Sequence, residues 1–136
     1  MPADQSKRLT PESLDSGVID PKDFFTFSPE EGTVSIAYGE DPDVSIVIWN
    51  LEPGQENSTH VHPASTHVQI VLTGSGEYLK DGKAIPVKAG QTIIVPRNVV
   101  HGIRNTGKER LSYMAVTAGE GYDRRPIGEQ KVSIGH

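Results

Sequence analysis

From Thr33 onward, short runs of β-forming residues alternate with turn signals along the chain. The Asp81-Gly82 pair between two such runs is a strong hairpin signal. No helical pattern of about 10–15 residues intervenes to build parallel βαβ units, so the pattern predicts an all-β sandwich or barrel. The expected strands are Val34–Tyr38, Val44–Leu51, Thr59–His62, His67–Leu72, Gly76–Leu79, Ala84–Val87, Thr92–Val95, Val100–Arg104 and Leu111–Thr117.

The two ends of the chain are expected to lie outside the barrel. The first 32 residues hold few apolar side chains, four prolines and one aromatic group, Phe24, Phe25 and Phe27. Such a segment cannot build a core of its own. Its phenylalanines either pack on the same domain or reach as an arm into a partner subunit, and the sequence favours neither. We therefore expect an N-terminal extension (1–32), a β-barrel domain (33–118) and a C-terminal tail (119–136).

Composition narrows the possible chemistry and partners. A chain of 136 residues fits one domain, and the absence of cysteine excludes disulfides, zinc ribbons, iron–sulfur sites and thiol nucleophiles. The net charge is −5, and no cluster of Lys and Arg indicates a nucleic-acid partner. No apolar run approaches the ~20 residues of a membrane span, and the N-terminus lacks an apolar leader. We expect a cytoplasmic protein with no membrane partner.

Four histidines form the most informative pattern in the chain. His60 and His62 share one face of a strand because alternate side chains point the same way. His67 opens the next run, and antiparallel pairing across a tight turn is expected to bring it opposite the pair. His101 comes from a distant strand, which a closed barrel permits. Imidazole is the commonest metal ligand among side chains, so we predict a metal site at these four residues. The alternative for His67 is a supporting residue behind the ligands or a surface histidine beside the turn.

The residues around the first three histidines match a known motif. From Gly54 the chain has five residues, His60-x-His62, four residues, His67, six residues and Gly74. This stretch is similar to the first motif of the cupin superfamily. One position departs from the motif, because the family usually has Glu where this chain has His67.

The residues around His101 match a second motif. From Gly90 the chain has five residues, Pro-Arg-Asn98, two residues, His101, three residues and Asn105. This stretch resembles the second cupin motif, with Asn98 where glycine is typical. Asn adopts the left-handed backbone conformation more readily than most residues. The resemblance covers about residues 44–118.

The resemblance implies a small jelly-roll β-barrel with one metal ion inside and, as in many members of the family, a homodimer. It carries over His60, His62 and His101 as ligands, and His67 at the usual Glu position. Four neutral imidazoles leave a divalent ion its full charge, which strengthens it as a Lewis acid toward an anionic substrate. Imidazole suits Fe, Ni, Cu and Zn better than Mn, so we expect a divalent transition metal from that group.

Two further side chains are candidates for catalysis. Gln69 follows His67 by two residues and shares its face, so it can hydrogen-bond a metal-bound water or a substrate, replace His67 as a ligand, or be an inward polar residue paired with a neighbour. Tyr113 is expected to face inward, where it is either a catalytic residue or part of the core.

Three functions are consistent with this predicted site. We expect a metal-dependent dioxygenase that acts on a small oxygen-rich or enolisable substrate. The first alternative is a metal-dependent isomerase, lyase or decarboxylase, which needs a proton-transfer group such as Tyr78, Tyr113 or an unligated His67. The second alternative is a cupin that binds a small ligand without turnover.

Overall fold

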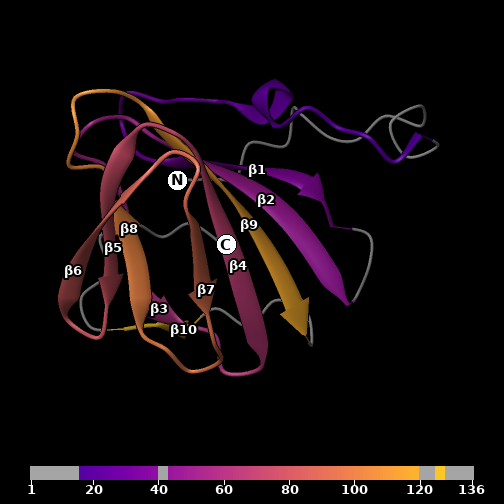
Figure 1. Ribbon diagram of the computed structural model, residues 1–136, viewed down its shortest axis with the longest axis vertical. Helices are drawn as coiled ribbons and strands as arrows, with labels where there is room; N and C mark the ends of the chain where they lie inside the picture. Colours follow the sequence, from indigo (N-terminus) through magenta and orange to yellow (C-terminus); the bar gives the residue numbers. More distant parts are fainter. Residues whose placement is uncertain (1–15, 40–42, 120–124, 128–136) are drawn as a thin grey trace.

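The computed structural model describes residues 16–39, 43–119 and 125–127, and it shows a nearly all-β architecture of two antiparallel sheets (Figure 1). Sheet A has the strand order β1-β2-β9-β4-β7 and sheet B the order β10-β3-β8-β5-β6. The elements are η1 (Pro21–Phe24), β1 (Thr33–Tyr38), β2 (Val44–Leu51), β3 (Glu56–Val61), β4 (Ser65–Thr73), β5 (Ser75–Lys80), β6 (Lys83–Lys88), β7 (Thr92–Val95), β8 (His101–Arg104), β9 (Leu111–Gly119) and β10 (Arg125–Pro126). The prediction of an all-β jelly-roll barrel is confirmed.

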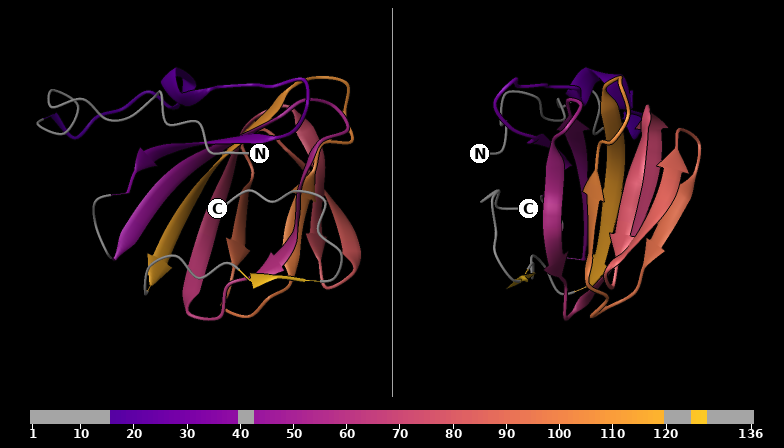
Figure 2. Two further views of the ribbon diagram at one scale, coloured as in Figure 1. Left: turned by 180° about the vertical axis from the view of Figure 1, so that it is seen from behind. Right: turned by 90° about the vertical axis from the view of Figure 1, so that its left-hand side faces the viewer.

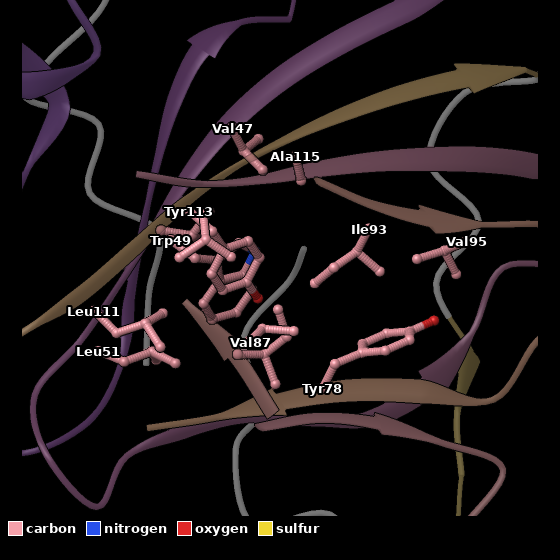
Figure 3. Close-up of a cluster of buried hydrophobic side chains, with 13 residues drawn as sticks. Val47, Trp49, Leu51, Tyr78, Val87, Ile93, Val95, Leu111, Tyr113 and Ala115 are labelled. Carbon is pink, nitrogen blue, oxygen red and sulfur yellow. The ribbon is translucent and has the colours of Figure 1, made fainter. Parts of the chain in front are cut away.

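The core lies between the two sheets, and alternation along the strands produces it (Figure 3). In β2 and β9 the inward side chains include Trp49 and Tyr113, which are register partners with nearly parallel rings 6.3 Å apart between centroids. In β4 every second side chain from Ser65 to Val71 is buried. The same alternation that builds this apolar interior therefore also turns the polar side chains of His67 and Gln69 inward.

Two turns behave as their sequences predict. Asp81 and Gly82 both have positive φ, 49° and 83°, and they link β5 to β6 as a two-residue hairpin. Asn98 has a φ of 67°, so it adopts the left-handed conformation expected of the residue that replaces a motif glycine. This conformation belongs to the loop that leads into β8 and His101.

The N-terminal segment packs on the outer face of sheet A (Figure 2). Asp20 caps the short η1 helix by accepting a hydrogen bond from the Lys22 amide, and Phe24 is buried in a second cluster with Ala37 and Ile48. The phenylalanines were expected either to pack on the same domain or to reach into a partner subunit. For Phe24 the structure shows packing on the same domain. Residues 1–15, within the predicted extension, lie outside the described residues.

Three local expectations differ from the structure. β3 belongs to sheet B and pairs with β8 and β10, whereas β4 belongs to sheet A and pairs with β9 and β7. The expected antiparallel pairing of His67 with the strand of His60 is therefore wrong, because the intervening turn crosses between sheets. β3 begins at Glu56, before the expected Thr59, and β10 was not expected. Most of the predicted tail 119–136 lies outside the described residues, and the predicted domain boundaries stay predictions.

Among the described residues, no helix combines the length and the apolar character that crossing a bilayer requires.

Candidate metal centre

Three histidines converge inside the barrel. His60 on β3 is the register partner of His101 on β8, and His62 follows directly after β3. One ring nitrogen from each of the three lies within 4.8 Å of the others. Their side chains are almost fully buried, with 2%, 3% and 1% exposure for His60, His62 and His101. The pairing of β3 with β8 therefore assembles a compact group of nitrogen donors from two separate parts of the sequence.

Backbone carbonyls fix the orientation of two of these rings. The Nδ1 atom of His60 lies 2.6 Å from the carbonyl oxygen of Ser58, and that of His101 lies 2.9 Å from the carbonyl oxygen of Val99. A carbonyl only accepts, so each Nδ1 carries the proton and donates. This places the lone pair of each neutral imidazole on Nε2. Metal-binding histidines are held in the same way, so the donor set fits a transition-metal ion.

His67 lies beside the group of three but is not part of it. Its ring centroid is 3.7 Å from that of His62 and 5.9 Å from that of His101. Its Nδ1 lies 3.2 Å from the Thr117 hydroxyl and its Nε2 lies 3.4 Å from the Ser65 hydroxyl. Both nitrogens of His67 therefore face protein hydroxyls, and its role as a fourth ligand stays a prediction.

The sequence did not single out Thr117, although a signal was present. Thr117 is the register partner of His67 and shares the inward face of β9 with Tyr113 and Ala115. A hydroxyl at an otherwise apolar, inward position points to a polar neighbour inside the barrel. Only the register between β4 and β9 identifies His67 as that neighbour.

The two predicted catalytic residues occupy different surroundings. Gln69 is 2% exposed, and its Oε1 atom has no hydrogen-bond partner among the residues that the structure describes. Tyr113 is fully buried in the core, where its hydroxyl accepts a hydrogen bond of 3.0 Å from the Asn57 side chain. Gln69 therefore presents an acceptor to the interior beside His67, whereas a protein group already holds the Tyr113 hydroxyl. Their catalytic roles stay predictions.

A tyrosine of sheet B borders the histidines from the other side. The ring of Tyr78 lies 6.5 Å from that of His101 between centroids. Burial, with the nearby Asp81 carboxylate adding to the effect, raises the pKa of Tyr78 to about 12. The phenol is therefore protonated at neutral pH and available as a hydrogen-bond donor.

The charged side chains nearest in sequence point away from this group. Arg104 on β8 is exposed and forms ion pairs with Glu56 and Glu77, with nitrogen–oxygen distances of 3.5 and 3.8 Å. Arg97, in the loop before β8, is exposed. The interior presents neutral nitrogen donors, and a donor set of imidazoles suits Fe, Ni, Cu and Zn ions.

The fold and these motifs agree with comparisons to known proteins. A protein with a double-stranded β-helix domain from Klebsiella pneumoniae subsp. pneumoniae superposes with a TM-score of 0.77 and 27% identity, over 82% of this chain and 97% of that one. The family model of the cupin domain matches residues 47–117, which is more than half of the chain. The chain belongs to the cupin family. The resemblance inferred from the two histidine motifs is thereby confirmed.

Two curated relatives carry names that describe a ligand or an activity. An oxalate-binding protein from Thermotoga maritima is 33% identical over 66 residues, which are 48% of this chain and 54% of that protein. Oxalate oxidase 2 from Hordeum vulgare is 35% identical over 77 residues, which are 51% of this chain and 34% of that protein. Each alignment thus covers less than two thirds of the relative.

Proposed function

We propose that this cupin binds one divalent transition-metal ion through His60, His62 and His101. The observation that carries the proposal is the convergence of three buried imidazoles, two of which are oriented by backbone carbonyls beside their Nδ1 atoms. Burying three imidazoles side by side costs desolvation at their ring nitrogens, and a bound cation would offset that cost. Fe, Ni, Cu and Zn fit this nitrogen donor set better than Mn, and His67 is the proposed fourth ligand or a support for His62.

The proposed substrate is a small, oxygen-rich anion or an enolisable compound. Two arguments support this class: an imidazole that binds a metal does so in its neutral form, so the ion would keep its full positive charge, and two relatives are named for oxalate. An Fe(II) ion held by these histidines would supply the redox chemistry of a dioxygenase. The expected activity is therefore the oxidative cleavage of a chelating substrate.

The chain's own residues would bind and shield such a substrate. Gln69, inward on β4 beside His67, offers its Oε1 as an acceptor for a hydrogen bond from a water molecule or a substrate hydroxyl. The apolar core around Trp49 and Tyr113 would limit the access of water to the bound substrate. The hydroxyl of Tyr113, held by Asn57, is the second proposed catalytic group.

Binding without turnover is the second candidate function, and two observations favour it over redox-neutral isomerase chemistry. An isomerase that forms an enolate needs a group that accepts a proton near the ion. The raised pKa of Tyr78 makes this phenol a poor base at neutral pH. Both His67 nitrogens face hydroxyls.

Anaerobic reconstitution tests the proposed function. The protein is loaded with Fe(II), and oxygen uptake and products are followed with oxalate, a β-diketone, a catechol and a 2-oxo acid. Uptake that disappears in His101→Ala supports the dioxygenase. Thermal stabilisation by oxalate, with no product by mass spectrometry, supports the binding protein. Failure to retain any metal overturns both. The homodimer and the cytoplasmic location stay predictions.

A further inference from the structure

Tyr78 has an unusual position for a buried tyrosine. It lies on the inward face of β5, where it is the register partner of Ile103 on β8, and only 5% of the residue is exposed. Figure 3 shows its ring between the two sheets, facing Ile93 and Val95 of β7. The side chain therefore projects from sheet B into the interior, on the side of the barrel that also contains His101.

The hydroxyl of Tyr78 has no hydrogen-bond partner among the described residues, although it is fully buried. Buried tyrosines ordinarily pair their hydroxyl, because an unmade hydrogen bond in an apolar environment is costly. Gln69 on β4 of the opposite sheet presents a second buried atom of this kind, its Oε1. Two unsatisfied polar atoms thus face the interior from opposite sheets, beside His67 and His101.

Tyr78 also lines a pocket. A pocket of about 370 Å³ lies where β6, the edge strand of sheet B, meets β7, the edge strand of sheet A. Its lining carries no charged side chain and consists of Tyr78, Ile85, Pro86, Val87, Gln91, Thr92 and Ile93. Tyr78 therefore contacts both a solvent-connected pocket and the ring of a proposed metal ligand.

We propose that Tyr78 is a substrate-binding residue whose hydroxyl donates a hydrogen bond to an anionic oxygen of a small chelating carboxylate or enolate. This inference rests on the proposed function. It extends that function by naming a recognition group on sheet B, and it assigns the β6–β7 pocket to the uncharged remainder of the substrate. A buried hydroxyl with no protein acceptor, on the side of the barrel that contains His101, is placed to donate to an anionic oxygen bound there.

Tyr78→Phe tests the inference because it removes only the hydroxyl and keeps the ring in the core. The matched control is Tyr38→Phe, at the end of β1 in the other sheet. Each variant is loaded with Zn(II), which is redox-inert, and titrated with oxalate by calorimetry. We expect Tyr78→Phe to bind oxalate at least about tenfold more weakly, the loss typical of a hydrogen bond to a charged group, while Tyr38→Phe matches the wild type.

The affinity for Zn(II) and the melting temperature of the metal-free protein distinguish a failure of this inference from a failure of the proposed function. Zinc affinity is expected to be equal in all three proteins, and metal-free Tyr78→Phe is expected to melt at the wild-type temperature or above it, because the lost hydroxyl had no protein partner. Unchanged oxalate affinity in Tyr78→Phe, with normal zinc binding, overturns this inference alone. A lower melting temperature of metal-free Tyr78→Phe overturns it as well. Failure of the wild type to bind zinc overturns the proposed function and this inference together.

Discussion

The imidazole of His67 stacks against that of His62 at a centroid distance of 3.7 Å, although β4 and β3 belong to different sheets. The contact bridges the two layers of the barrel at the proposed metal centre. It places a neutral imidazole where the family motif usually has a carboxylate. The identity of this one side chain therefore affects the charge directly beside the three proposed ligands.

Replacing that imidazole is expected to change metal preference. In His67→Glu, the added carboxylate supplies the oxygen donor that Mn(II) prefers and lowers the charge of the centre. We expect Mn(II) affinity to rise at least about tenfold relative to the wild type, an effect of the size that neighbouring groups exert on metal sites. Competitive titration with Mn(II) and Zn(II) measures this. His67→Gln, similar in size but neutral, is the control, and an equal gain in both variants would contradict the electrostatic explanation.

A methyl group at Gly102 is expected to separate two of the proposed ligands. A Cβ atom there would lie 2.7 Å from the Asn57 carbonyl oxygen and 3.1 Å from the Thr59 amide nitrogen, both on β3. Because these are backbone atoms, β8 has to move away from β3, and the pairing of His60 with His101 is disturbed.

Gly102→Ala should therefore cost about 1–3 kcal/mol of stability, as overpacking does, and weaken metal binding as well. Denaturation and zinc titration measure the two effects. Gly39→Ala is the control, because its nearest neighbour is the end of the Ile36 side chain. Wild-type zinc affinity in Gly102→Ala would show that the β3–β8 pairing does not position the ligands.

The N-terminal segment is expected to stabilise the barrel without affecting the metal centre. Phe24 is buried against Ala37 and Ile48 on the outer face of sheet A, away from the histidines. Phe24→Ala should reduce the free energy of unfolding by about 3 kcal/mol and expose this segment to limited proteolysis, while zinc affinity is unchanged. Phe25→Ala, where the side chain is only half-buried, should cost less. Equal losses in the two variants would argue against docking through Phe24.

The pKa of Tyr78 predicts a loss of stability at alkaline pH. The folded value is about 12 and the ordinary value is 10.0, so between these pH values the unfolded phenol loses its proton while the folded phenol keeps it. Because the unfolded state then binds fewer protons, the free energy of unfolding falls as pH rises through this window.

Comparison of the wild type with Tyr78→Phe isolates this effect. The wild type should lose stability relative to the variant between pH 10 and pH 12, and tyrosinate absorbance should show one high-pH titration that the variant lacks. Parallel stability curves for the two proteins would contradict a raised pKa at Tyr78.

The nine main strands were predictable because each carries a run of β-forming residues bounded by turn signals. The alternation of His60 and His62, and the spacing to His101, likewise predicted a shared site from the sequence alone. β10 was not predictable, because Arg125–Pro126 is only two residues long and is a strand only through its pairing with β3.

The strand pairing of His67 is the main expectation that the structure corrects, although its ring does lie beside that of His62. A turn after His62 is compatible both with a hairpin and with a crossing between sheets, and only the pairing of β4 with β9 decides between them. The same non-local register places Thr117 beside His67 and Tyr78 beside His101. Strand boundaries are encoded locally, whereas contacts between strands of a jelly roll depend on register between distant segments.

The central claim is that His60, His62 and His101 bind a transition-metal ion through imidazole nitrogens. X-ray absorption spectroscopy at the metal edge, on protein loaded with one equivalent of Zn(II) or Fe(II), tests it most directly. The account predicts one tightly bound ion per chain with at least three imidazole ligands. In His101→Ala it predicts that this coordination is lost. Metal binding that is absent in the wild type, or unaltered in His101→Ala, would contradict it.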